Sequence, residues 1–168
     1  MIVPHDPEPL LGVLVDHGVD LIVVGGYAVA AHGHVRATKD IDICPDPAEE
    51  NLKRLAAALA ALEAKSIGSD EFDVGEFDLL PDLEGLRAGG NWSLTTKFGR
   101  LDLKQHLAGL GDEGGGWAVL VKHAITRSVL GHECLFCSYE DLIKMKLGAD
   151  RPQDKVDVAS LKAARGEA

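Results

Sequence analysis

An alternation of aspartate and isoleucine, Asp40-Ile-Asp-Ile43, constrains the fold of this chain more than any other short segment. Successive side chains of a β-strand point to opposite faces, so both carboxylates leave one face and both isoleucines leave the other. We therefore predict a half-buried strand that stops at Pro45-Asp46-Pro47. Aspartate has poor strand propensity and the two carboxylates repel each other, which favours a bound cation over a solvated acidic face.

A glycine pair precedes this strand in the sequence. The aliphatic run from Leu21 to Val24 ends at Gly25-Gly26, and a small-residue segment from Tyr27 to His32 follows. This order predicts a strand, a tight turn and a short helix. The unpaired N–H groups where such a helix begins can bind phosphate, although glycine also serves packing alone at this kind of turn.

A third carboxylate occurs in the same kind of setting. Leu101-Asp102-Leu103 predicts a strand that points its leucines inward and Asp102 outward. Together with Asp40 and Asp42 it completes a set of three carboxylates. Such a set can bind two Mg²⁺ ions about 3.5–4 Å apart, the arrangement used for displacement at phosphorus.

The remaining periodicities predict further helices and strands. We expect helices at 10–17, 48–64, 117–123, 138–147 and from Pro152 onward, and strands at 92–96, 101–103, 125–130 and 133–137. The last helix should point Val156, Val158, Ala159 and Leu161 inward. Residues 66–90 predict only a short strand or loops, anchored by Phe72, Val74 and Phe77.

The charge, the apolar stretches and the cysteines of the chain exclude some classes of function. With 17 Lys and Arg against 27 Asp and Glu, the net charge of -10 makes binding to duplex DNA unexpected. We expect no membrane span, because no apolar stretch approaches about 18 residues. Three cysteines cannot all pair, which favours a reducing, cytoplasmic setting. The length of 168 residues suits one domain, with a core at about 8–137 and a C-terminal helical extension at about 138–168.

The segment from Val23 to Ile43 resembles the signature of the nucleotidyltransferase superfamily: a hydrophobic strand, Gly-Gly or Gly-Ser, a short helix, Arg-x-Thr/Ser and Asp-x-Asp. The segment around Asp102 resembles the strand that carries the third carboxylate. Tyr139 to Leu161 resembles the C-terminal helices of stand-alone bacterial members, including abortive-infection and toxin–antitoxin nucleotidyltransferases. The resemblance implies the α/β (α+β) palm of DNA polymerase beta, a small mixed sheet with helices packed on one side and a C-terminal helical segment.

The resemblance also implies roles for single residues. Asp40 and Asp42 would hold two Mg²⁺ or Mn²⁺ ions, and Asp102 would hold the ion that activates the acceptor hydroxyl. The remaining candidates would bind the nucleotide: Gly25 and Gly26 around the phosphates, Thr38 orienting the loop, and Arg36, Lys146 and Arg151 neutralising the triphosphate. Position 26 departs from the many members that have Ser there.

The implied reaction is transfer of NMP from an NTP, such as ATP, to a hydroxyl of an acceptor, with release of pyrophosphate. The acceptor could be tRNA, a protein or a small molecule, and the acidic composition favours the last two over long RNA. The alternative is a catalytically weak nucleotide-binding or partner-binding module of a toxin–antitoxin pair, with a cognate toxin or antitoxin as partner. Asp154 and Asp157, three apart on one helical face, are expected to pair with Lys or Arg or to orient a phosphate-binding cation.

Overall fold

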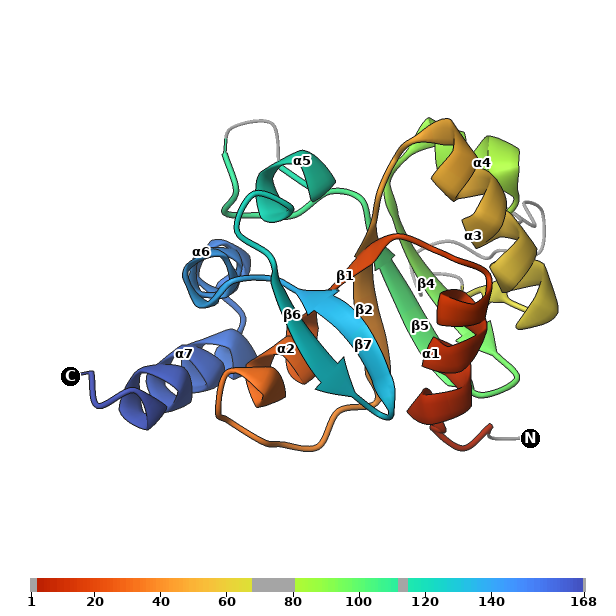
Figure 1. Ribbon diagram of the computed structural model, residues 1–168. Helices are drawn as coiled ribbons and strands as arrows, with labels where there is room; N and C mark the ends of the chain where they lie inside the picture. The colour runs from red at the N-terminus through yellow and green to blue at the C-terminus, as the bar shows by residue number, and fades with distance from the viewer. Residues whose placement is uncertain (1–2, 68–80, 112–114, 168) are drawn as a thin grey trace.

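A computed structural model describes residues 3–67, 81–111 and 115–167. Within these ranges, helices and a seven-stranded mixed sheet make up the fold (Figure 1). The helices are α1 (Pro7–Asp16), α2 (Gly25–Ala31), α3 (Glu49–Ala61), α4 (Leu83–Ala88), α5 (Trp117–Leu120), α6 (Tyr139–Ala149) and α7 (Pro152–Ala164). The strands are β1 (Leu21–Val24), β2 (Asp40–Pro45), β3 (Lys65–Ser66), β4 (Asn91–Thr96), β5 (Gly99–Lys104), β6 (Ile125–Val129) and β7 (His132–Phe136).

The sheet has the strand order β3-β4-β5-β2-β1-β7-β6. The strand β2 runs antiparallel to β1, with Val24 opposite Asp42, and parallel to β5, with Asp42 opposite Asp102. The strand β7 pairs with β1 in parallel and leads directly into α6. This register places the strand that carries Asp-x-Asp between the glycine turn and the strand that carries the third carboxylate.

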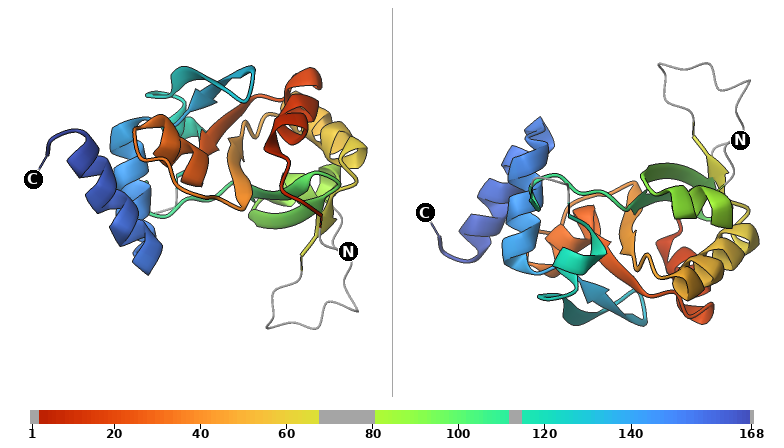
Figure 2. Two further views of the ribbon diagram at one scale, coloured as in Figure 1. Left: turned by 90° about the horizontal axis from the view of Figure 1, so that it is seen from below. Right: turned by 90° about the horizontal axis from the view of Figure 1, so that it is seen from above.

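Most of the helices form two groups. In Figures 1 and 2, α1, α3 and α4 lie together at one end of the molecule, while α6 and α7 lie at the opposite end, next to α2. The core combines buried strand residues such as Ile43 and Leu103 with leucines of α1 and α3 such as Leu14 and Leu55. Burial of these apolar side chains is the main force that holds the helices on the sheet. The predicted mixed α/β fold with a C-terminal helical segment is confirmed.

The C-terminal helices differ from the prediction in the face that they bury. Val156 is 54% exposed and Ala159 is exposed, so the prediction that they point inward is wrong. Val158 and Leu161 are buried as expected, and Asp154 and Asp157 share their face. The helix α7 therefore buries two carboxylates beside its apolar contacts, which requires cationic partners from other elements.

The segment 66–90 also holds a helix that the sequence did not suggest. The helix α4 begins after Asp82, whose carboxylate accepts a hydrogen bond from the Gly85 N–H. The expected anchors Phe72, Val74 and Phe77 lie outside the described residues. Among the described residues, no helix is both long enough and apolar enough to span a membrane.

Candidate active site

Three carboxylates from two adjacent strands meet on one face of the sheet. One oxygen from each of Asp40, Asp42 and Asp102 lies within 4.8 Å of the others. Asp40 and Asp42 share a face because they are two apart on β2, and the parallel register with β5 places Asp102 beside Asp42. The structure thus brings together side chains about sixty residues apart, as the sequence predicted.

The three carboxylates carry more negative charge than the two nearby lysines, Lys104 and Lys146, offset. Burial, reinforced by the charges of Asp40 and Asp102, raises the pKa of Asp42 to about 7, although Lys104 and Lys146 act in the opposite direction. Burial and Asp40 likewise raise the pKa of Asp102 above its usual range. The Oδ1 atom of Asp102 is buried without a hydrogen-bond partner among the described residues. Hard oxygen ligands with these properties fit a divalent cation such as Mg²⁺ or Mn²⁺.

The glycine turn is in direct contact with this cluster. Gly25 has φ 66°, in the left-handed region, and a Cβ at this position would overlap the Asp42 carboxylate. A Cβ at Gly26 would approach the Thr38 hydroxyl oxygen to 2.8 Å, closer than real Cβ contacts. Close approach to Asp42 thus explains Gly25 better than packing alone. Thr38 itself donates a hydrogen bond to the Asp40 carbonyl at 3.2 Å.

The three cations expected at the triphosphate form one ion-pair network with α7. Arg36 donates to both carboxylate oxygens of Asp157 at 2.8 and 2.9 Å. The Lys146 ammonium lies 2.9 Å from Asp157 and 3.1 Å from Asp154, and Arg151 reaches Asp154 at 2.7 Å. The expectation that Asp154 and Asp157 pair with Lys or Arg is confirmed. Three cations and two carboxylates leave the network one positive charge.

This network lies close enough to influence the carboxylate cluster. The charge of Lys146 lowers the pKa of Asp42, although burial raises it by more. The pKa of Arg151 is raised mainly by its hydrogen bond to Asp154, and the charge of Asp42 adds to this effect. Lys146 is held deeply, with a side chain only 7% exposed, whereas Arg151 is 70% exposed. The structure therefore places the predicted cations beside the predicted carboxylates, with Lys146 the most rigidly held.

Sequence reasoning missed Lys104. It follows Asp102 by two residues on β5, so it shares the acidic face, and its Nζ lies 3.9 Å from Asp102 Oδ2. The same period-2 argument that identified the aspartates could have found it. The cluster thus has one lysine from the sheet and one from α6.

Tyr27 and His5 were also missed. Tyr27 follows the glycine pair, and its hydroxyl lies 2.9 Å from Nε2 of His5. Burial and, after it, the charge of Asp40 raise the pKa of Tyr27. The segment before α1 is held by a hydrogen bond from the Asp6 N–H to the Phe98 carbonyl at 2.8 Å. No short motif in the sequence links these two residues.

Solved structures of nucleotidyltransferases share this architecture. The lincomycin-bound lincosamide antibiotic adenylyltransferase LnuA matches with a TM-score of 0.62 and 16% identity, over 95% of this chain and 98% of LnuA. The antibiotic-resistance factor ANT(2'')-Ia matches with a TM-score of 0.55 and 18% identity, over 94% of this chain and 79% of that one. A Thermotoga maritima protein designated a nucleotidyltransferase matches with a TM-score of 0.55 and 15% identity, over 92% of this chain and 88% of that one.

Comparisons of the sequence with family models and with curated proteins find no match. At such low identities the likeness is one of fold, and the predicted nucleotidyltransferase fold is confirmed. The chain has the nucleotidyltransferase fold.

Proposed function

We propose that the chain transfers NMP from an NTP to a hydroxyl group of a small-molecule acceptor and releases pyrophosphate. The observation that carries this proposal is the convergence of Asp40, Asp42 and Asp102 within 4.8 Å, in contact with the turn at Gly25. A cluster of mutually repelling carboxylates beside a tight glycine turn suits metal-dependent displacement at phosphorus.

Each group of residues has a separate task in this proposal. The three carboxylates hold the divalent cations, which when bound offset the charge of the triphosphate and of the reacting phosphoryl group. The backbone at Gly25 and Gly26 approaches the β- and γ-phosphates without steric hindrance. Arg36, Lys146 and Arg151 stabilise the departing pyrophosphate, since their network keeps one positive charge after internal pairing.

The bond changes follow from this placement. The acceptor hydroxyl oxygen forms a bond to the α-phosphorus and gives its proton to water. The bond from that phosphorus to the bridging oxygen breaks, and pyrophosphate leaves with the electron pair. Positioning and fixed charges supply the catalysis, so residues that hold Lys146 and Arg36 in place contribute to the rate.

Three observations favour a small-molecule acceptor. LnuA, which this chain matches over 98% of its length, is described with bound lincomycin. ANT(2'')-Ia is described in complex with adenylyl-2''-tobramycin, and that structure matches with a TM-score of 0.52 over 94% of this chain. The net charge of -10 also favours a neutral or cationic small molecule over tRNA.

A labelling experiment tests the proposal. The purified chain is incubated with each of the four α-³²P-labelled NTPs, Mg²⁺ or Mn²⁺, and three acceptor classes: hydroxyl-bearing small molecules including lincosamides and aminoglycosides, total tRNA, and cell protein. We expect label on a small molecule, with loss of transfer in EDTA. Asp42→Asn should lower transfer at least about 10³-fold, roughly 4 kcal/mol, with unchanged circular dichroism.

Three other results would each contradict a part of the proposal. Transfer by Asp42→Asn at the wild-type rate would remove these carboxylates from the reaction. Label on tRNA or protein would support the transfer reaction but contradict the proposed small-molecule acceptor. An inactive wild type that binds a neighbouring gene's product tightly would favour the toxin–antitoxin alternative.

A further inference from the structure

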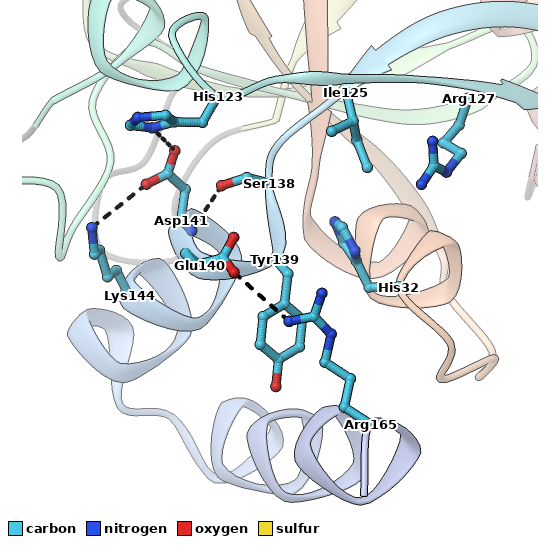
Figure 3. A pocket seen from close by; sticks show the side chains of 10 residues that line it. All are labelled: His32, His123, Ile125, Arg127, Ser138, Tyr139, Glu140, Asp141, Lys144 and Arg165. Atoms are coloured by element: carbon cyan, nitrogen blue, oxygen red, sulfur yellow. Dashed lines mark hydrogen bonds and ion pairs between the residues drawn. The ribbon is translucent and has the colours of Figure 1, made fainter. Parts of the chain in front are cut away.

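A cavity of about 660 Å³ lies at the opposite end of α2 from the glycine turn. Its walls come from the end of α2, the start of α6, the end of α7, the strand β6 and His123, which precedes β6 (Figure 3). None of the three clustered carboxylates lines it, and neither do Gly25, Lys146 or Arg36. It is therefore separate from the candidate active site.

The cavity concentrates positive charge in an acidic chain. Three basic side chains line it, Arg127, Lys144 and Arg165, and two acidic ones, Glu140 and Asp141. The whole chain, in contrast, carries a net charge of -10. At one end Asp141 lies 3.8 Å from Lys144 and 3.4 Å from His123, so the acid and its neighbours largely satisfy one another. At the other end, Arg165 is paired with Glu140 at 3.7 Å and with Glu167 at 4.0 Å, so the excess of positive charge there comes from one side chain.

Arg127 supplies that excess. It donates a hydrogen bond to the neighbouring Thr126 carbonyl at 3.0 Å, and within the described ranges it forms no ion pair. In Figure 3 its guanidinium points toward His32 and Arg165, which approach from α2 and α7. Three elements thus direct nitrogen-bearing side chains at one part of the cavity.

Arg165 and His32 are held in place for contact with a ligand. The Arg165 guanidinium lies 3.7 Å from the centroid of the Tyr139 ring and 3.7 Å from Glu140. His32 Nε2 donates to the Cys137 carbonyl at 2.8 Å, because a carbonyl can only accept. In the neutral ring Nδ1 is then an acceptor, which can take a hydrogen bond from a hydroxyl of the organic part of a ligand. These contacts limit the motion of both side chains and so lower the entropy cost of binding.

We infer that this cavity is a second binding site, which takes a small organic phosphate with its phosphate between Arg127 and Arg165. Guanidinium groups match phosphate oxygens in a bidentate manner. The volume falls in the range of small-ligand pockets, so it accommodates more than a free anion. Ile125 and the Tyr139 ring offer apolar surface to the organic part. This site does not depend on the proposed transferase activity.

Two probes test the inference, inorganic phosphate and adenosine 5′-monophosphate, in EDTA so that metal-dependent binding is suppressed. The ¹⁵N-labelled full chain is titrated with each probe and amide shifts are followed by NMR. We expect saturable shifts at residues 32, 127, 139 and 165, with AMP binding at least as tightly as phosphate. Arg127→Ala should weaken both at least about tenfold. Lys53→Ala, which removes one positive charge from α3 on the far side of the molecule, should not.

Arg127 is exposed on an edge strand, so its replacement should leave the fold intact. Asp42→Asn should bind both probes like the wild type. Three results would overturn the inference: no saturable shifts at the cavity up to tens of millimolar, equal affinity in Arg127→Ala, or shifts confined to residues 24–26. Tighter binding of phosphate than of AMP would overturn the organic part of the assignment.

Discussion

Two clusters of buried or partly buried aspartates lie near each other in this molecule, and their surroundings have opposite effects on their pKa values. Asp154 and Asp157 on α7 are each bonded to two cationic side chains, and despite burial these bonds keep their pKa values below the usual range. In the sheet cluster burial and like charges instead raise the pKa of Asp42 to about 7. The α7 cluster is neutralised by side chains of the described residues, whereas we propose that the sheet cluster binds cations from solution.

The largest effect should come from breaking the α7 cluster. Asp157→Ala leaves Arg36 and Lys146 without their shared carboxylate, and we expect a loss of about 3 kcal/mol in unfolding free energy. Urea denaturation measures it. Glu50→Ala, which removes an exposed partner of Lys53, should change the unfolding free energy far less. Equal losses in both variants would mean that the α7 network contributes no more than a surface ion pair.

The glycine turn gives a sharper test of contact between backbone and carboxylate. Gly25→Ala places a Cβ against Asp42 at a left-handed φ of 66°, and we expect a stability loss of about 2 kcal/mol with at least about tenfold weaker Mn²⁺ binding. Gly131→Ala is the matched control, since φ is 80° and no atom lies within 4 Å of the added Cβ. It should show only the backbone strain, about 1 kcal/mol. Unchanged Mn²⁺ affinity in Gly25→Ala would separate the turn from the metal site.

The pH dependence of stability should have opposite signs in the two clusters. The folded pKa of Asp42 exceeds its unfolded value near 4, so the folded chain binds more protons and loses stability as pH rises from about 4 through about 7. Asp157 has a depressed pKa, so its contribution is present above about pH 4 and is lost as pH falls toward the folded value.

Denaturation in EDTA at pH 5 and pH 8 measures this slope. Asp42→Asn should be more stable than the wild type at pH 8, by about 1–2 kcal/mol, and nearly equal at pH 5. Saturating Mn²⁺ should stabilise the wild type far more at pH 8 than at pH 5, because binding requires the ionised carboxylates. A wild type that is equally stable at both pH values, with or without Mn²⁺, would argue against an unneutralised acidic cluster.

The smallest effect concerns Lys104. Its ammonium, 3.9 Å from Asp102, competes with a divalent cation for the same carboxylate. At pH 8, Lys104→Met should tighten Mn²⁺ binding about threefold by calorimetry, equivalent to about 0.6 kcal/mol. Lys65→Met, on the short edge strand β3, should leave the affinity unchanged. Weaker binding in Lys104→Met would show that the lysine helps to assemble the site.

The sequence was informative wherever local periodicity decided the outcome. The alternation around Asp40 and Asp42 predicted both the strand and the face of the carboxylates, and the i, i+3 spacing of Asp154 and Asp157 indicated paired acids. The sequence of α7 alone does not indicate which face of the helix is buried. Arg36, more than a hundred residues earlier, decides that Asp157 is buried and Val156 exposed.

The other omissions have similar causes. The contact between Tyr27 and His5 depends on how the segment before α1 crosses the sheet, which no local pattern records. Asp82 offered a helix-capping signal for α4 within an acidic, glycine-punctuated segment, where it was easily missed. The assigned roles of Gly25, Lys146 and the carboxylates in catalysis stay predictions, although their proximity is now described.

The link of two residues between α6 and α7 has a consequence for engineering the chain. Lys146 lies before this link and its carboxylate partners lie after it, so the helical hairpin carries charges that neutralise one another across a single turn. A truncation at residue 150 would delete both carboxylates and leave Arg36 and Lys146 without counterions next to the sheet. Shortening the C-terminus by one helix should therefore impair solubility, folding yield and nucleotide binding together.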